Sequence, residues 1–251
     1  MIPILHTEKL CKSFSNGAAQ QHVIKNLDLE IMDGDFSVIM GASGSGKSTL
    51  LYALSGMDKP TLGKVFFGDT EIQDYSNDQL AVFRRKNCGF VFQSIYLLEN
   101  QNVLDNVLTG AFAVQKNPAL IKRVKELLAK VGLDEAMQKK YPNQLSGGEA
   151  QRVGIVRAVI NEPKILFADE PTGSLNSASG KDVLDIFTGV HENGQSIVMV
   201  THDIKTALRG TRVIYLRDGK VVGEHRMAKY GEDDLKERRE KLTIFLDEMG
   251  W

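Results

Sequence analysis

The sequence predicts an α/β fold with a mainly parallel sheet, an antiparallel β part and an inserted α-helical part. Three observations lead to this class: strand-like alternation in the first third, apolar residues at helical spacing in the middle, and strands that alternate with helices in the last third. The chain has 251 residues, which is enough for a large α/β unit with a sizeable buried core.

The first third has the pattern of short strands and tight turns. Apolar and acidic residues alternate over 27–31, and the turn pair Asp33-Gly34 then precedes the apolar run 36–40, which predicts a hairpin. Further strands are expected at 64–67 and 89–92. We therefore expect antiparallel β structure around the first glycine-rich motif.

The middle of the chain has a helical period. Apolar residues recur at helical spacing from Pro118 to Val131, and Gly132 follows as a stop signal. The expected organisation is one unit over 1–230 with three parts and a C-terminal helical extension over 231–251. The three parts are a β part with the first glycine-rich motif at 1–93, a helical part at about 94–150, and the rest of the core at 151–230.

The last third alternates strands with helices. Strands are expected at 164–168, 196–201 and 212–216, and helices at 178–191 and 204–208. Such alternation predicts parallel strands covered on both faces. Asp218-Gly219 then predicts a closing hairpin with 220–224.

Composition excludes several classes. With 31 basic and 32 acidic residues the net charge is −1, which argues against broad capture of nucleic acid or of an acidic membrane surface.

Cys11 and Cys88 form no CxxC pair, so we expect reduced thiols rather than a disulfide framework or a zinc site. No apolar run approaches the roughly 20 residues of a membrane span, and Met1–Leu10 lacks a secretory pattern. A membrane role would need an anchoring partner.

A P-loop pattern follows the apolar run 36–40. Its glycines let successive N–H groups point at phosphate oxygens, and the helix that follows adds partial positive charge. We expect Lys47 to hold the β- and γ-phosphates and the Ser48 hydroxyl to bind Mg²⁺. A strand before and a helix after disfavour the alternative of a glycine-rich turn without a ligand. The expected nucleotide-binding residues are Gly41, Ser43, Gly44, Ser45, Gly46, Lys47, Ser48 and Thr49.

A second motif ends an apolar strand in two acids. The strand 165–168 is followed by Asp169 and Glu170, and a buried parallel strand delivers its last residue to the sheet edge where ligands bind. Asp169 is expected to hold Mg²⁺, directly or through water, and Glu170 to polarise the attacking water. Taken alone, the pair could be solvated acids at a strand end.

A third motif places Ser146, Gly147, Gly148 and Glu149 at the start of a helix. This is a second potential anion cradle, which one chain rarely needs for one triphosphate. With Gln151-Arg152 after it, the run resembles the signature sequence of ABC ATPases. The resemblance implies a RecA-like core, ATP and Mg²⁺ as ligands, ATP hydrolysis, and contact of Ser146, Gly147, Gly148 and Glu149 with ATP.

Other landmarks of that family follow in order from about 4 to 224. Phe14 resembles the aromatic that stacks on adenine, Gln93 the glutamine near Mg²⁺ and the lytic water, and His202 the switch histidine at the γ-phosphate. On residue type alone, Phe14 would more often be a packing residue, Gln93 a polar strand end and His202 an ordinary histidine. The resemblance implies a catalytic set of Glu170, His202, Gln93 and Lys47, and metal ligands Ser48, Gln93 and Asp169.

The resemblance also implies partners. Two such subunits pair head to tail, with ATP between the P-loop of one and the signature of the other, and drive a membrane permease. We expect a second ATPase subunit, most simply a second copy, a permease, no nucleic-acid partner, and a peripheral location on the cytoplasmic face of the membrane. The family's D-loop aspartate is replaced by Asn176, which loses charge but no catalytic group, so hydrolysis should be retained.

Two stretches narrow the subfamily. Residues 169–174 with Tyr141-Pro142, and 89–93 with Leu97-Leu98, look like those of lipoprotein-release, macrolide-export and bacitracin-resistance ATPases. This favours export or detoxification of an antimicrobial peptide or lipid-linked substrate. A cell-division-type regulator of an extracytoplasmic partner and an importer ATPase stay open, and the sequence does not name the cargo.

The extension over 231–251 has an apolar helical face. Leu235, Leu242, Phe245, Leu246 and Met249 recur on one side, with Trp251 at the end. The helix is expected to pack on its own unit, and contact with a second subunit is the alternative.

Overall fold

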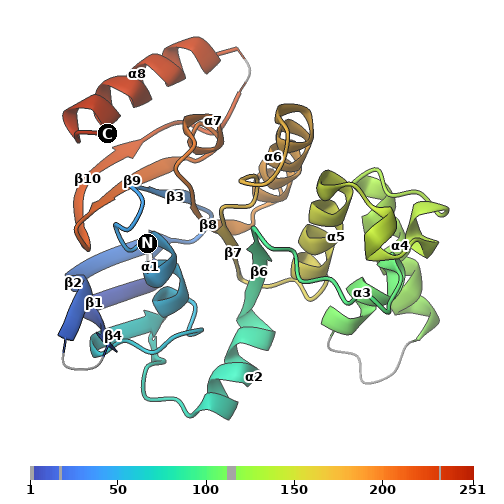
Figure 1. Cartoon of the computed structure of the whole chain (residues 1–251), viewed down its shortest axis with the longest axis horizontal. Helices are drawn as coiled ribbons and strands as arrows, with labels where there is room; N and C mark the ends of the chain where they lie inside the picture. Colours follow the sequence, from blue (N-terminus) through green and yellow to red (C-terminus); the bar gives the residue numbers. More distant parts are fainter. Residues whose placement is uncertain (1–2, 17–18, 112–116, 232) are drawn as a thin grey trace.

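The computed structural model describes residues 3–16, 19–111, 117–231 and 233–251. It contains a six-stranded and a four-stranded sheet, with a group of helices to one side (Figure 1). The predicted helical part includes 112–116, and the predicted extension includes 232; these positions lie outside the described residues.

The six-stranded sheet is the centre of the molecule. Its order is β10-β9-β3-β8-β7-β6, and all neighbours are parallel except β10, which closes an antiparallel hairpin with β9. The predicted closing hairpin is thus confirmed. The strands are β3 (Phe36–Met40), β6 (Cys88–Phe92), β7 (Ile165–Asp169), β8 (Ser196–Val200), β9 (Arg212–Arg217) and β10 (Lys220–Arg226).

The four-stranded sheet is antiparallel. Two strands of 14 residues, β1 and β2, form its longest pair, and the sheet order is β2-β1-β4-β5. Its apolar side faces helix α1 and the six-stranded sheet, and Leu5, Leu29 and Leu51 share one core there. The elements are β1 (Pro3–Asn16), β2 (Ala19–Met32), β4 (Leu62–Phe67), β5 (Thr70–Glu71) and α1 (Lys47–Leu54).

The predicted hairpin between 27–31 and 36–40 is wrong. β2 pairs with β1 in the small sheet, whereas β3 lies between β8 and β9 in the large one. All five residues of β3 are buried, so this strand needs a neighbour along each edge and cover on both faces. The strand 89–92, expected in the antiparallel part, also belongs to the large sheet and pairs in parallel with β7.

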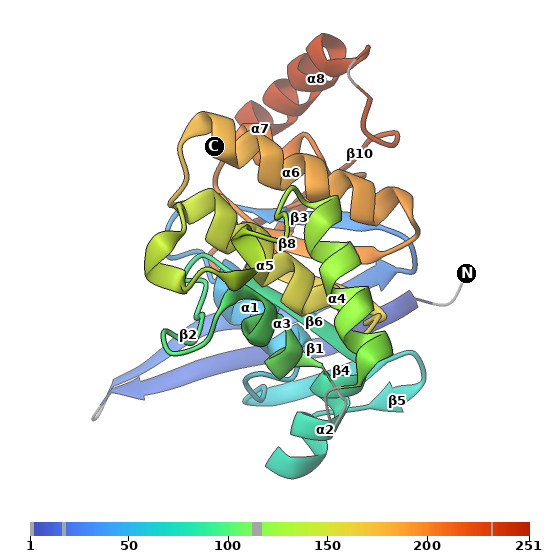
Figure 2. The ribbon, with the colours of Figure 1, turned by 90° about the vertical axis from the view of Figure 1, so that its right-hand side faces the viewer.

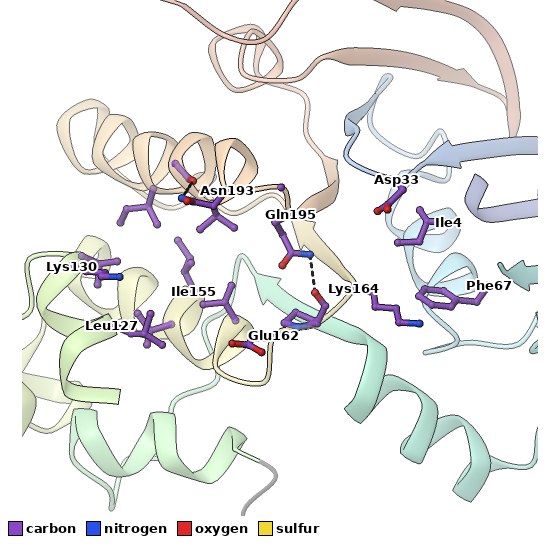
Figure 3. Close-up of a pocket in the computed structure, with 18 of the residues that line it drawn as sticks. Ile4, Asp33, Phe67, Leu127, Lys130, Ile155, Glu162, Lys164, Asn193 and Gln195 are labelled. Carbon is purple, nitrogen blue, oxygen red and sulfur yellow. Dashed lines mark hydrogen bonds between the residues drawn. The ribbon is translucent and has the colours of Figure 1, made fainter. Parts of the chain in front are cut away.

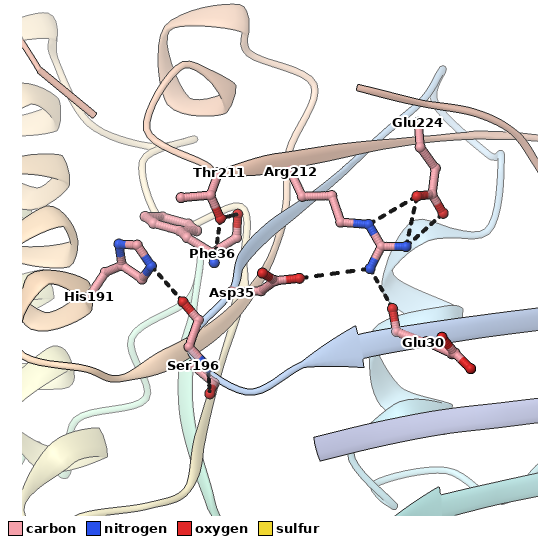
Figure 4. A network of polar contacts seen from close by, with 9 residues as sticks. Glu30, Asp35, Phe36, His191, Ser196, Thr211, Arg212 and Glu224 are labelled. Atoms are coloured by element: carbon pink, nitrogen blue, oxygen red, sulfur yellow. Dashed lines mark hydrogen bonds and ion pairs between the residues drawn. The ribbon is translucent and has the colours of Figure 1, made fainter. Parts of the chain in front are cut away.

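A polar network holds the chain where it crosses between the sheets (Figure 4). The N–H of Gly34 donates to Ser196 Oγ at 2.9 Å, and that hydroxyl donates to Asp33 Oδ1 at 2.8 Å. The buried guanidinium of Arg212 donates to the backbone oxygen of Glu30 and to both carboxylate oxygens of Glu224. Strands β2, β8, β9 and β10 are thereby tied together beside the crossing.

The helical part has a core of its own. Val107, Val124, Leu128, Val153 and Val156 are buried together. The predicted helix 118–131 is found as α4, capped by the Asn117 side chain and ended by a left-handed glycine at 132. The elements are α3 (Val103–Gly110), α4 (Pro118–Lys130), the 3-10 turns η1 (Met137–Lys139) and η2 (Pro142–Gln144), and α5 (Gly147–Val159).

The remaining helices cover the large sheet and its edge. In Figure 2, α4, α5 and α6 lie on the side toward the viewer, and α8 stands at the top. Among the described residues no helix is both long enough and apolar enough to cross a membrane. The remaining elements are α2 (Asn77–Asn87), α6 (Ser177–Glu192), α7 (Ile204–Ala207) and α8 (Leu235–Glu248).

Helix α8 packs on its own sheet, as the first interpretation of the extension predicted. Leu242, Phe245 and Leu246 are buried in the core that also holds Val213 and Tyr215 of β9. Leu235 does not join them and stays 37% exposed. The apolar face therefore stabilises the single chain.

We predict that Leu242→Ala lowers the free energy of unfolding by about 2–5 kcal/mol, because it leaves a cavity at a fully buried position. Ile244→Ala, at a position 54% exposed on the same helix, should change it by less than about 0.5 kcal/mol. Chemical denaturation of both variants checks this. Equal effects would contradict the packing of α8 described above.

Candidate functional site

The predicted P-loop connects β3 to α1 and forms a tight cradle. Gly44 and Gly46 adopt the left-handed backbone region that favours glycine. A Cβ added to Gly41 would lie 2.1 Å from the backbone oxygen of Leu216, so the loop can sit this close to β9 only with glycine there. Ser45 is buried, and its Oγ has no hydrogen-bond partner among the described residues. An unpartnered buried hydroxyl inside the cradle fits a phosphate ligand.

Lys47 is held inside this loop. Its Nζ donates to the backbone oxygens of Gly41 at 2.9 Å and of Ala42 at 3.0 Å. Burial lowers the pKa of the lysine, and the nearby charges of Glu170 and Asp169 act in the opposite direction. The ammonium is therefore positioned at the cradle, opposite two carboxylates.

Asp169 stands at the end of β7, facing α1. Its Oδ1 accepts a hydrogen bond from Ser48 Oγ at 2.9 Å, and its Oδ2 accepts one from the Tyr52 hydroxyl at 2.6 Å. Burial, followed by the hydrogen bond to Asp169, raises the pKa of Tyr52. The structure thus brings together Ser48 and Asp169, the two residues expected to bind Mg²⁺, and adds Tyr52 beside them.

Glu170 and His202 meet at the same sheet edge. His202 Nδ1 lies 2.8 Å from Glu170 Oε1, and the imidazole is 67% exposed while the carboxylate is 17% exposed. Glu170 has a φ of 46°, an uncommon value for a residue with a side chain, and its N–H donates to Val200 O at 3.0 Å. The turn after Asp169 therefore aims Glu170 at the loop after β8.

Of the other predicted residues, Gln93 lies at the rim of this group and Phe14 lies on β1. Gln93 follows β6, and its amide nitrogen would be 3.1 Å from a Cβ placed on Gly173, in the turn after Glu170. In the described part of the chain its side chain makes no hydrogen bond to Asp169 or Ser48. Phe14 is 45% exposed on β1, with Lys12 Nζ 5.0 Å from its ring centre.

The signature residues begin α5, away from the P-loop. In Figure 1, α5 and α1 lie on opposite sides of β6 and β7. Ser146 Oγ accepts from the Glu149 N–H at 3.3 Å, and Glu149 Oε2 accepts from the Ser146 N–H at 2.6 Å, which is a capping box. That N–H donation also lowers the pKa of Glu149. Gly147 is exposed at the helix start, and Gly148 is buried against Ser179 of α6.

Asn176 occupies the D-loop position and caps α6. Its Oδ1 accepts a hydrogen bond from the Ser179 N–H at 2.9 Å. An aspartate carboxylate can make the same capping bond. The amide therefore preserves the local fold and changes only the charge.

Sequence reasoning gave no structural role to three residues whose side chains hold segments beside the site. Besides Tyr52, they are Gln151, whose Nε2 donates to Phe92 O at 3.1 Å, and Arg157, which donates to the backbone oxygens of Ile95 and Tyr96. Tyr52 could have been found from its spacing, because residues i and i+4 of a helix share a face and Ser48 is at that distance. The other two depend on tertiary packing.

A large hollow lies elsewhere on the molecule. It measures about 1430 Å³ and is lined by α4, α5, α6 and the turns near Lys164 and Gln195 (Figure 3). None of the predicted site residues lines it. A second hollow, of about 580 Å³, includes Glu170, His202 and Asn176. The predicted catalytic residues Glu170 and His202 therefore lie at the second hollow, and not at the larger hollow.

The residues present fit a Mg²⁺-nucleotide. A glycine cradle with an unpartnered buried hydroxyl and a lysine suits a triphosphate, and a hydroxyl beside a carboxylate suits a hard cation. No group of three or more His, Cys, Asp or Glu residues capable of holding a metal occurs among the described residues. Ser48 and Asp169 offer two donors, and phosphate oxygens and water would complete the coordination of the cation.

Comparisons with known proteins agree with this geometry. The family described as "ABC transporter" matches residues 24–173. The lipoprotein-releasing system ATP-binding protein LolD of Aquifex aeolicus is 46% identical over 226 residues, 89% of this chain and 98% of that protein. The macrolide export ATP-binding/permease protein MacB of Aggregatibacter actinomycetemcomitans is 41% identical over 222 residues, 88% of this chain but 34% of that protein.

A solved structure gives the same result for the fold. The dimeric post-hydrolysis state of the ATP-binding cassette MJ0796 bound to ADP and Pi superposes with a TM-score of 0.82. It is 37% identical and covers 90% of this chain and 100% of its own. The predicted fold class and family are confirmed. The chain belongs to the ABC transporter family as an ATP-binding subunit, and it is an ATPase of that family.

Proposed function

We propose that two copies of this chain pair head to tail, hydrolyse ATP at two shared sites and drive a membrane permease that exports or detoxifies an antimicrobial peptide or a lipid-linked substrate. The main support for the proposal is that two sets of site residues lie apart within one chain. The P-loop, Asp169, Glu170 and His202 meet at one sheet edge, whereas the exposed start of α5 lies across β6 and β7.

The P-loop residues bind the phosphates in this proposal. The N–H groups of the loop and the Ser45 hydroxyl donate to phosphate oxygens, and Lys47 exchanges its two carbonyl partners for the β- and γ-phosphates. Phe14 stacks on the adenine. The exposed ring of Phe14 supports this role, because a buried ring would not be available.

Ser48, Asp169 and Gln93 would hold Mg²⁺. When bound, the ion neutralises charge that develops on the phosphate oxygens. Ser48 and Asp169 are already hydrogen-bonded to each other, which supports a shared ligand. Gln93 lies beside the same turn.

Glu170 and His202 act on the reacting end of the nucleotide. Glu170 accepts a hydrogen bond from the attacking water and polarises it, and His202 donates to the γ-phosphate. Their contact at 2.8 Å supports this assignment, because it places both side chains at the same end of the proposed nucleotide site. A good general base must lie within hydrogen-bond reach of its proton.

The start of α5 completes the site of the opposite subunit. Its first N–H groups carry partial positive charge, and the capping box leaves Gly147 free at the surface. The dimeric state of the similar cassette supports this pairing. Closure on ATP and opening after hydrolysis would then supply the movement.

The proposed permease partner and the proposed cargo are inferred from the names of the relatives. LolD is named as part of a lipoprotein-releasing system, and MacB as an ATP-binding/permease protein of which this chain matches about a third. These names support a permease as the partner of this chain. Such a partner would hold it at the cytoplasmic face of the membrane.

We predict that Gly41→Ala abolishes ATP binding, because the added methyl group collides with Leu216 O and forces the loop away from β9. Gly189→Ala in α6 has no atom within 4 Å of the added carbon and should bind ATP normally, with the helix slightly stabilised. Titration calorimetry with ATP and thermal melting check both variants. Normal ATP binding by Gly41→Ala would contradict the proposed cradle.

We predict that two inactive variants complement each other. Lys47→Ala removes the P-loop charge, and Gly147→Asp adds a carboxylate that repels ATP across the interface while remaining favourable at a helix start. An equal mixture should regain about a quarter of the wild-type rate, since half of the dimers are mixed and each has one intact site. Steady-state ATPase assays of each variant and of the mixture check this. No recovery from a mixed dimer of verified mass would exclude the head-to-tail site.

We predict that the chain co-purifies from membranes with a permease. Mass spectrometry of the complex identifies the partner, and a permease encoded with a large extracytoplasmic part supports the export proposal. A high-affinity solute-binding protein in the complex would indicate import instead. Recovery with a cell-wall hydrolase would indicate regulation, and recovery only with ribosomes or DNA would overturn the transport role.

A further inference from the structure

Tyr52 lies one helical turn after Ser48 on α1. Residues four apart on a helix share a face, so both hydroxyls point toward the end of β7. Each donates to a different oxygen of the Asp169 carboxylate, Ser48 at 2.9 Å to Oδ1 and Tyr52 at 2.6 Å to Oδ2. The carboxylate is thereby fixed from both sides by one helix.

The Ser48 and Tyr52 hydroxyls differ in their other interactions. The Ser48 hydroxyl is small and is a proposed ligand of Mg²⁺, so its bond to Asp169 is exchanged when the cation is bound. The Tyr52 hydroxyl is carried by a ring that packs at the edge of the core between the two sheets. Its direction is therefore fixed by packing, and its hydrogen bond to Asp169 does not depend on the nucleotide.

A hydrogen-bonded carboxylate is a better-defined ligand than a free one. Partners outside the ligand shell set the orientation of a metal-binding carboxylate, and losing one typically weakens metal binding by tenfold or more. A short bond from a phenol to a charged oxygen is of the strong, charge-assisted kind. No other side chain in the described part of the structure donates to Asp169 Oδ2.

We propose that Tyr52 is a positioning residue, which holds the Asp169 carboxylate in the orientation that binds the Mg²⁺ of the Mg²⁺-nucleotide. This inference rests on the proposed function of Ser48 and Asp169. It assigns Tyr52 no contact with the nucleotide. The hydroxyl should therefore matter for the cation and leave the cradle for the phosphates unchanged.

The test is the Mg²⁺ dependence of nucleotide binding by the full chain. ADP binding is measured by titration calorimetry with excess EDTA and then over a series of Mg²⁺ concentrations. Tyr52→Phe removes only the hydroxyl and keeps the ring. We expect the Mg²⁺ concentration for half-maximal enhancement of binding to rise about tenfold, with ADP affinity in EDTA unchanged within about twofold.

Two controls separate this effect from a general loss of structure. Tyr75→Phe removes a tyrosine hydroxyl that makes no hydrogen bond to any residue the structure describes, on a ring packed edge-on against Phe83, and should titrate like the wild type. Thermal melting shows whether each variant is folded. Tyr52→His, which keeps a donor on a shorter side chain, should recover part of the Mg²⁺ response.

Three results would count against the inference. An unchanged Mg²⁺ response in folded Tyr52→Phe would overturn it, and so would an equal loss of ADP affinity with and without Mg²⁺. A wild-type chain that binds ADP without any response to Mg²⁺ would instead overturn the proposed role of Ser48 and Asp169, and this inference with it.

Discussion

The site depends on the register of the large sheet, which brings three buried parallel strands, β3, β8 and β7, to an end at the same level. In the register of the sheet, Ile39 of β3 lies opposite Val200 of β8, and Val200 lies opposite Asp169 of β7. The segments that follow these strands therefore emerge side by side. They are the P-loop after Met40, Glu170, and the loop that carries His202. Residues far apart in sequence become neighbours because the hydrogen-bond ladder admits only one register.

The same constraint explains why the site faces outward. A parallel strand buried on both faces offers side chains to ligands only at its end. Asp169 is the first residue of β7 that is not fully buried, after four buried residues. The acids are thus held by a rigid element and still reach solvent, and Glu170 takes an unusual backbone conformation to do so. The start of α5 belongs to a separate core and is not among the segments that follow β3, β7 and β8.

The sequence predicted what depends on local pattern. The helix at 118–131, the closing hairpin and the motif residues of the P-loop could be predicted because each is written in consecutive residues. The assignment of 36–40 to a hairpin failed because a turn signal such as Asp33-Gly34 marks a change of direction and not the next pairing partner. The feature that favours a place for 36–40 in the large sheet is the burial of every residue in β3. The helical spacing places Tyr52 on the same face as Ser48, but the bond that gives it a role is made with Asp169, 117 residues away.

Helix α8 also contacts the segment between α7 and β9, by a route that no local pattern contains. Arg238 of α8 is buried, and its guanidinium donates to the backbone oxygens of Leu208 at 2.6 Å and of Gly210, where α7 has ended. Helix α7 begins two residues after His202. Without Arg238 those two carbonyls would lose the donors that satisfy them, at a cost typical of buried unpaired polar groups. The packing of α8 is therefore linked through α7 to the loop that carries His202, although 36 residues separate Arg238 from His202.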